Sequence, residues 1–218
     1  MVDGGVELWG VEIGAPDVAD AGAAYARLLR IEPEPLGDGG RRFALERGTV
    51  DILPGEAGLR ALRLAGDSPV SAGFHGLPVV VAPPETRAPG PTGVAIDHVV
   101  VRTPDADRAI RLWRDRLALR LALDRVFPER GLRLVFFRSG GMTLEFATAH
   151  PAAEPLDGPD VLYGVSYRVT DLAARRERLV ATGVDVGPIR AGMRPGTLVA
   201  SVRSGTADVP TLLLQVDA

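Results

Sequence analysis

The chain has 218 residues, 46% of them hydrophobic and 5% aromatic, so it can bury one large core or two small ones by aliphatic packing. A formal net charge of −3 provides no basic surface for nucleic acid, and the lack of cysteine excludes disulfides and thiolate metal sites. All 25 basic residues are arginine, which excludes a lysine Schiff base. No apolar run approaches the ~20 residues that cross a bilayer, and no leader precedes the first strand, so we expect a cytoplasmic protein without a membrane segment.

The N-terminal half predicts one complete module and one reduced module. A helix begins at Asp17, and apolar residues recur along one of its faces. The segment 68–73 has the composition of a loop where a second helix would be expected, so we predict that the second module has lost its helix and part of its sheet. The predicted elements of this half are a helix over 17–30 and strands over 6–14, 41–46, 49–53, 59–65 and 77–81.

A connector is predicted between the two halves. Residues 82–93 contain four prolines and two glycines without apolar periodicity, which is typical of a semi-rigid linker. We therefore predict an N-terminal domain over 1–82, a linker over 83–93 and a C-terminal domain over 94–218.

The C-terminal half predicts two complete modules. A helix follows Asp105, and Ser139-Gly140-Gly141 has the residues of a tight hairpin turn. A second helix, over 171–182, is stopped by Gly183. The predicted strands cover 94–102, 119–126, 132–138, 142–148, 161–169, 186–190, 198–203 and 211–217.

The modules share a fixed spacing between a residue in the first strand and the aspartate that caps the helix. The distance is seven positions in three modules. The three pairs are Gly10 and Asp17, His98 and Asp105, and Gly164 and Asp171. Such internal repetition predicts an α+β protein built from tandem βαβββ modules that form mixed sheets, with a degenerate N-terminal half.

Four segments resemble a known family. They are IDHVVVRTPDADRAIRLWRDRLAL and GMTLEF in the third module, and VTDLAARRERLVATGVDV and VPTLLLQV in the fourth. In these segments the chain resembles the vicinal oxygen chelate superfamily, which includes glyoxalase I, the bleomycin and fosfomycin resistance proteins, methylmalonyl-CoA epimerase and the extradiol dioxygenases. The resemblance covers residues 94–218 and, less closely, residues 5–54.

The resemblance implies a fold and a metal site. Paired modules would curve into an open, glyoxalase-like barrel with a divalent ion on its floor, held by the first and last strand of each module. The corresponding positions are His98 and Glu145 in the third module, Gly164 and Gln215 in the fourth, and Gly10 and Asp51 in the first. Because glycine offers no donor, the expected metal ligands are His98, Glu145 and Gln215, for Fe, Mn, Co, Ni or Zn.

The residues themselves leave metal binding open. Strand alternation places His98 on one face with Val100 and Arg102, and Glu145 on one face with Thr143. A half-buried histidine–glutamate pair without an ion fits the same pattern. The missing side chain at Gly164 either opens a coordination position with a pocket beside it or marks the loss of metal binding.

Candidate substrate contacts lie on the same strands. Arg102 and Arg168 each precede a capping aspartate by three residues, where paired guanidinium groups can hold a carboxylate or phosphate. The alternative is that Arg102 and Arg168 lie at solvent-exposed strand ends and bind no substrate. Ser166 and Phe136 are further candidates for substrate contact.

Two functions from different classes follow. The first is a lyase or isomerase in which a divalent ion polarises vicinal oxygens and Glu145 serves as ligand and general base. The second is a metal-free protein that binds a drug-like small molecule in a cup lined by Phe136, Phe137, Trp113 and Tyr167. An extradiol dioxygenase ranks lower because its usual second histidine ligand is missing. We expect a small-molecule partner, and a homodimer that covers exposed strand edges.

Overall fold

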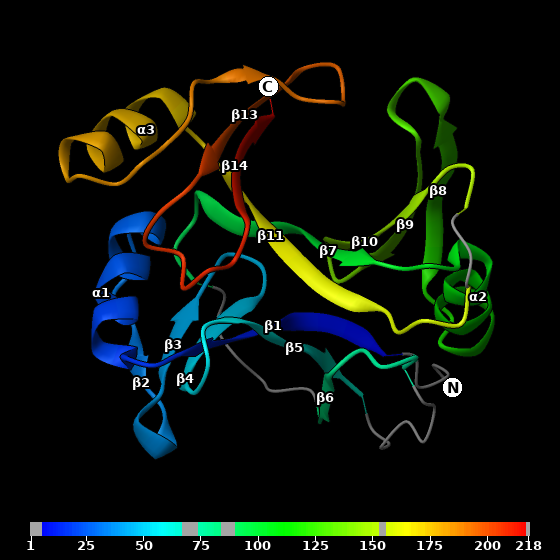
Figure 1. The fold of residues 1–218 in the computed structure, drawn as a ribbon. Coiled ribbons are helices and arrows are strands. Elements are labelled where there is room, and N and C mark those ends of the chain that lie inside the picture. Colours follow the sequence, from blue (N-terminus) through cyan, green and yellow to red (C-terminus); the bar gives the residue numbers. More distant parts are fainter. Residues whose placement is uncertain (1–5, 67–73, 84–89, 153–155, 217–218) are drawn as a thin grey trace. The chain divides into compact units, whose positions relative to one another are not determined.

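The first module is a complete βαβββ unit. The computed structural model describes residues 6–66, 74–83, 90–152 and 156–216 (Figure 1). The elements of the first module are β1 (Glu7–Ala15), α1 (Val18–Leu29), β2 (Glu34–Pro35), the short turn η1 (Gly37–Gly39), β3 (Arg41–Ala44) and β4 (Thr49–Pro54). β1 pairs in parallel with β4, and β3 lies antiparallel to both β4 and β2. α1 begins at Asp17, whose carboxylate accepts a hydrogen bond from the Asp20 N–H at 2.9 Å.

The second module is reduced to a parallel strand pair in the part that the structure describes. Its strands are β5 (Gly58–Ala65) and β6 (Val79–Ala82). The segment 68–73, where we predict a lost helix, lies outside the described residues.

The third module carries the candidate site. Its elements are β7 (Val94–Arg102), α2 (Ala106–Ile110), the π-helical turn η2 (Arg111–Arg116), β8 (Arg120–Phe127), the short turn η3 (Pro128–Arg130), β9 (Leu132–Ser139) and β10 (Met142–Ala149). Asp105 caps α2 through the Arg108 N–H at 2.9 Å. In the π-turn, the Leu117 N–H donates to the Leu112 carbonyl five residues earlier.

The fourth module repeats the plan with one difference from the prediction. Its elements are β11 (Val161–Val169), α3 (Leu172–Ala181), β12 (Arg190–Ala191), β13 (Thr197–Val202) and β14 (Thr211–Val216). Asp171 caps α3 through the Ala174 N–H at 2.9 Å. The strand predicted over 186–190 is replaced by a single bridge between Val186 and Val202 and by the two-residue β12. Pro188, which has no N–H, explains the interruption.

The strands form two mixed sheets, and the predicted α+β class is confirmed. In the described ranges, one sheet has six strands in the order β2-β3-β4-β1-β5-β6. The other has eight strands in the order β12-β13-β14-β11-β7-β10-β9-β8. The searched residues contain no helix with the length and apolar character that a membrane crossing requires.

Contacts between Cα atoms divide the chain into two compact units. Unit 1 comprises residues 1–9, 61–87 and 98–163, and unit 2 comprises residues 10–60, 88–97 and 164–218. Each unit thus draws on both halves of the sequence. The predicted domain division with a linker over 83–93 stays a prediction.

Each unit has its own core. In unit 1, Trp113 packs against Phe74 and Phe146 at ring-centroid distances of 5.7 and 5.8 Å, and Phe137 meets Phe146 edge-on. This cluster joins the helical segment to β9 and β10. In unit 2, the fully buried Tyr25 packs against Phe43 and donates a hydrogen bond to the Thr206 carbonyl at 3.0 Å.

Candidate functional site

His98 and Glu145 meet on one face of two neighbouring strands. β7 and β10 run parallel, with His98 opposite Thr143, so the two side chains share a face. The His98 Nε2 and Glu145 Oε2 atoms lie 3.7 Å apart, and each side chain is 17% exposed. Val99 and Leu144, on the other face, are fully buried. The core therefore fixes which way the imidazole and the carboxylate point.

The strand register confirms that the first module is built on the same plan. Gly10 lies opposite Thr49 as His98 lies opposite Thr143. Asp51 is two residues beyond Thr49, just as Glu145 is two residues beyond its own Thr143. Asp51 is therefore the structural counterpart of Glu145.

The register corrects the counterpart predicted for the fourth module. Val165 lies opposite Thr211, so Gly164 corresponds to Pro210 in the same register. The position that matches Glu145 is two residues further along β14, at Leu212. Gln215 is three residues further along β14 and hence on the opposite face. Its Oε1 accepts a hydrogen bond from the Leu172 N–H at 2.8 Å, at the start of α3. The oxygen expected to bind a metal thus caps a helix.

Gly164 does not leave the pocket that its missing side chain suggests. A Cβ atom at Gly164 would lie 2.5 Å from the Pro210 carbonyl oxygen. At Gly10, the corresponding Cβ would collide in the same way with the Thr49 carbonyl oxygen. The backbone of the last strand already fills this space, so a ligand side chain has no room there.

The carboxylates of the first and third modules have different neighbours. Asp51 is 1% exposed and forms two hydrogen bonds, of 2.7 and 2.6 Å, with Arg42 on β3. The corresponding position opposite Glu145 on β9 is Phe136, which is half-buried. A bidentate guanidinium thus neutralises Asp51, whereas Glu145 has an aromatic ring beside it and an imidazole 3.7 Å away.

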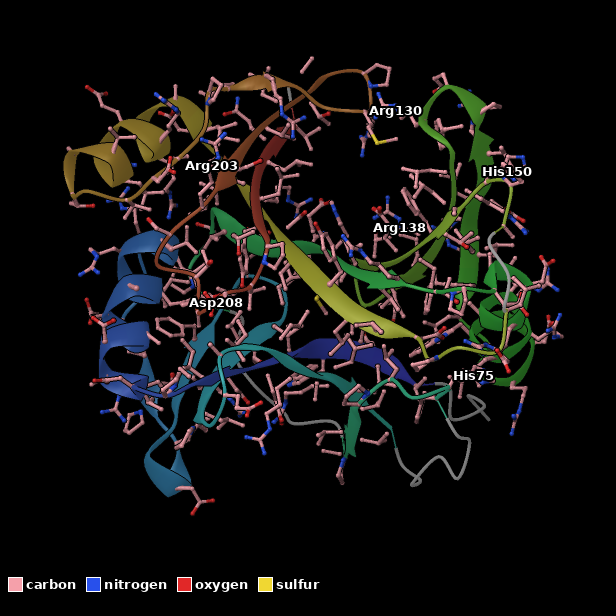
Figure 2. The ribbon with its side chains drawn as sticks, in the orientation of Figure 1. His75, Arg130, Arg138, His150, Arg203 and Asp208 are labelled. Carbon is pink, nitrogen blue, oxygen red and sulfur yellow. The ribbon has the colours of Figure 1, made fainter. Side chains whose placement is uncertain are left out.

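Two arginines on this face were missed by the sequence analysis. Arg138 on β9 lies opposite Thr143, and Arg120 on β8 lies opposite Arg138. Both are exposed, and among the described residues neither has a carboxylate partner. Figure 2 shows Arg138 on the side of β9 turned away from α2. The Gly140-Gly141 turn, by fixing the register of β9 and β10, is the sequence signal that could have found Arg138.

The other predicted substrate contacts are spread over both units. The Arg102 guanidinium lies 3.7 Å from the ring centroid of Tyr163, a cation–π contact in unit 1. Ser166 and Arg168 lie on β11 in unit 2, with Ser166 2% exposed and Arg168 half-buried.

Of the four aromatic residues predicted to line the cup, only Phe136 is half-exposed. The other three have no exposed surface and form cores: Phe137, Trp113 and Tyr167.

His98 and Glu145 lie close enough together to supply two ligands to one divalent ion. Ligand bonds of about 2.0–2.2 Å allow two donors to share an ion at separations up to about 4.2 Å, so 3.7 Å is within reach. Within the described ranges, no group of three or more histidine, aspartate or glutamate side chains gathers as a metal site. His75 beside α2 and His150 after β10 join no such group (Figure 2). Water or substrate oxygens would complete the coordination.

Comparison with known proteins finds a family match around this site. The model of the glyoxalase/bleomycin resistance protein/dioxygenase superfamily matches residues 97–200, which include His98 and Glu145. Just under half of the chain is thus similar to this superfamily. No curated protein matches the chain.

One solved structure supports the fold over nearly the whole chain. A mutant of 4-hydroxymandelate synthase from Streptomyces coelicolor is similar over 97% of this chain and 93% of its own, with a TM-score of 0.73 and 13% identity. Methylmalonyl-CoA epimerase from Mycobacterium tuberculosis is similar over 58% of this chain and 89% of its own, with a TM-score of 0.47 and 20% identity. The first similarity extends the fold assignment to the whole chain.

Proposed function

We propose that this protein is a lyase or isomerase that acts on a small molecule with neighbouring oxygens, with His98 and Glu145 as its side-chain ligands to a divalent ion. The 3.7 Å approach of Nε2 and Oε2 on one face supports this proposal. A neutral imidazole and a carboxylate suit Fe, Mn, Co, Ni or Zn. Gln215 is left out because its oxygen already caps α3.

The residues at the site would have distinct roles in the reaction. A bound ion would act as a Lewis acid toward substrate oxygens. Glu145 is the carboxylate that can accept a proton from a carbon next to a carbonyl group. His98 holds its imidazole on the face of Glu145 because Val99 is anchored in the core. Phe136, directly opposite Glu145 on β9, gives the carboxylate an apolar neighbour.

The arginine pair points to an anionic substrate. Like charges directly opposite each other on neighbouring strands repel, and Arg120 and Arg138 form such a pair. A carboxylate or phosphate between them would relieve this repulsion by charge-assisted hydrogen bonds. Arg102, although stacked on Tyr163, keeps an exposed guanidinium that can serve the same purpose.

Metal titration tests the proposal. Protein stripped with a chelator is titrated calorimetrically with Ni, Co, Zn, Mn and, without oxygen, Fe(II). We expect one ion per chain, and at least about tenfold weaker binding in His98→Ala and in Glu145→Gln. His150→Ala, which removes an exposed histidine elsewhere, should leave the affinity unchanged. Equal affinities of the wild type and His98→Ala would overturn the proposal.

The metal-free alternative has its own supporting observation. Half-buried apolar side chains share the face of Glu145 by strand register, among them Val100, Leu123 and Phe136. Such a surface could hold an aromatic ligand without an ion. A thermal-shift screen of aromatic acids distinguishes the two functions, because stabilisation that survives in the His98→Ala, Glu145→Gln double variant favours simple binding.

A further inference from the structure

Four arginines line a cavity in unit 2, and none of them is among the residues assigned above. The cavity has a volume of about 170 Å³, several times the ~30 Å³ share of a water molecule in the liquid. It lies between the C-terminal end of α1 and one face of α3. Its lining consists of Arg27, Arg30, Arg175, Arg178, Leu179 and Thr182.

Arg175 is the buried member of this group. It is 7% exposed, and its Nη1 donates to the Leu28 carbonyl at 2.8 Å, at the end of α1. Burial, and then the charges of Arg30 and Arg178, lower the pKa of Arg175 from its ordinary value to about 10. In the described part of the chain, its remaining N–H groups have no protein acceptor.

The charges around the cavity are not balanced by the protein. Within the described ranges, none of the four guanidinium groups pairs with a carboxylate, and the lining contains no acidic residue. The C-terminal ends of α1 and α3 contribute roughly half a negative charge each. Four positive charges therefore face about one negative charge, in a chain whose net charge is −3.

We propose that this cavity is a binding site for a phosphate group, either free or on a phosphorylated small molecule. Guanidinium groups bind phosphate oxygens in pairs, and a partly desolvated Arg175 would bind them more strongly than an exposed arginine. The exposed Arg27 and Arg178 complete the set from the two helices. The site is independent of His98 and Glu145 and stands whether or not a metal binds there.

Binding of inorganic phosphate tests this site on the full chain. Phosphate is titrated by calorimetry at constant ionic strength, with sodium chloride as the ionic control. We expect Arg178→Gln and Arg27→Gln each to weaken phosphate binding by at least about tenfold. Both positions are on the exposed surface, so the melting temperature without phosphate should stay close to that of the wild type.

The control removes an equal charge elsewhere. Arg130→Gln, in the exposed turn η3 of unit 1, should leave phosphate binding unchanged (Figure 2). Glucose 6-phosphate serves as a second probe, and binding of either compound with the same dependence on Arg178 supports the site. The proposal is overturned if neither compound binds more tightly than chloride, or if Arg130→Gln weakens binding as much as Arg178→Gln.

Discussion

The first and third modules place a carboxylate at the same register position and use it differently. Asp51 lies opposite Arg42 and is almost completely buried in a bidentate ion pair. Glu145 lies opposite Phe136 and faces His98. The residue opposite each carboxylate on the adjacent strand thus differs, a guanidinium beside Asp51 and an aromatic ring beside Glu145.

The largest expected effect is on stability. Asp51→Ala removes the buried carboxylate of a bidentate ion pair with Arg42 and should lower the free energy of unfolding by about 3–5 kcal/mol. Glu145→Ala should change it by less, about 1 kcal/mol, because the Glu145 side chain is 17% exposed whereas that of Asp51 is 1% exposed. Urea denaturation in the presence of a chelator measures both. Equal losses would show that the two carboxylates play the same structural part.

The next largest effect on the free energy of unfolding is expected at Gly10 in β1 and Gly164 in β11. Gly10→Ala and Gly164→Ala each drive a Cβ into a carbonyl oxygen and should cost about 1–3 kcal/mol of unfolding free energy. Gly37→Ala serves as control, since a Cβ there meets nothing within 4 Å. Melting temperatures of the three variants provide the comparison. A harmless Gly164→Ala would mean that a ligand side chain could be accommodated there after all.

Exchange of the neighbouring residue tests the comparison directly. Phe136→Arg recreates the arrangement of Arg42 and Asp51 beside Glu145, and should weaken divalent-ion binding by at least about tenfold because a guanidinium competes for the carboxylate. Phe136→Leu keeps an apolar neighbour and should retain the wild-type affinity. Calorimetric titration of both variants decides, and unchanged binding in Phe136→Arg would rule out this explanation of the difference.

Loss of a helix N-cap should have the smallest effect on stability, and the effect should be equal in the first and third modules. Asp17→Ala and Asp105→Ala each remove a helix N-cap bond of 2.9 Å and should each cost about 1 kcal/mol of unfolding free energy. Similar losses would show that the modules share a scaffold and differ at the ligand position. A loss confined to one module would show that the caps are not equivalent.

Local chemistry made much of this fold predictable from the sequence. The three capping aspartates act on the first turn of their own helices, so their role depends on residues three positions away. The glycine pair after Ser139 fixes the hairpin of β9 and β10 in a similar way. His98 and Glu145 were predicted from the family resemblance, and strand alternation then placed each side chain on one face of its strand.

Other features depend on pairing between distant segments. Gln215 was matched to Glu145 through the family resemblance, but the register of β14 follows a turn in which Ala207 and Asp208 have positive φ. The ion pair of Arg42 with Asp51 likewise requires the register of β3 and β4. The arginine cavity joins helices from the two ends of the sequence, which no local pattern reveals.

A short link near the start of the chain bears on the position of Glu145. The Leu8 N–H donates to the Ser139 Oγ at 2.6 Å, and both residues are buried in unit 1. Ser139 is the last residue of β9 and lies opposite Met142, three positions before the glutamate. A fragment trimmed to residues 94–218 would keep both proposed ligands, His98 and Glu145, and lose this hydrogen bond from the N-terminal half of the sequence.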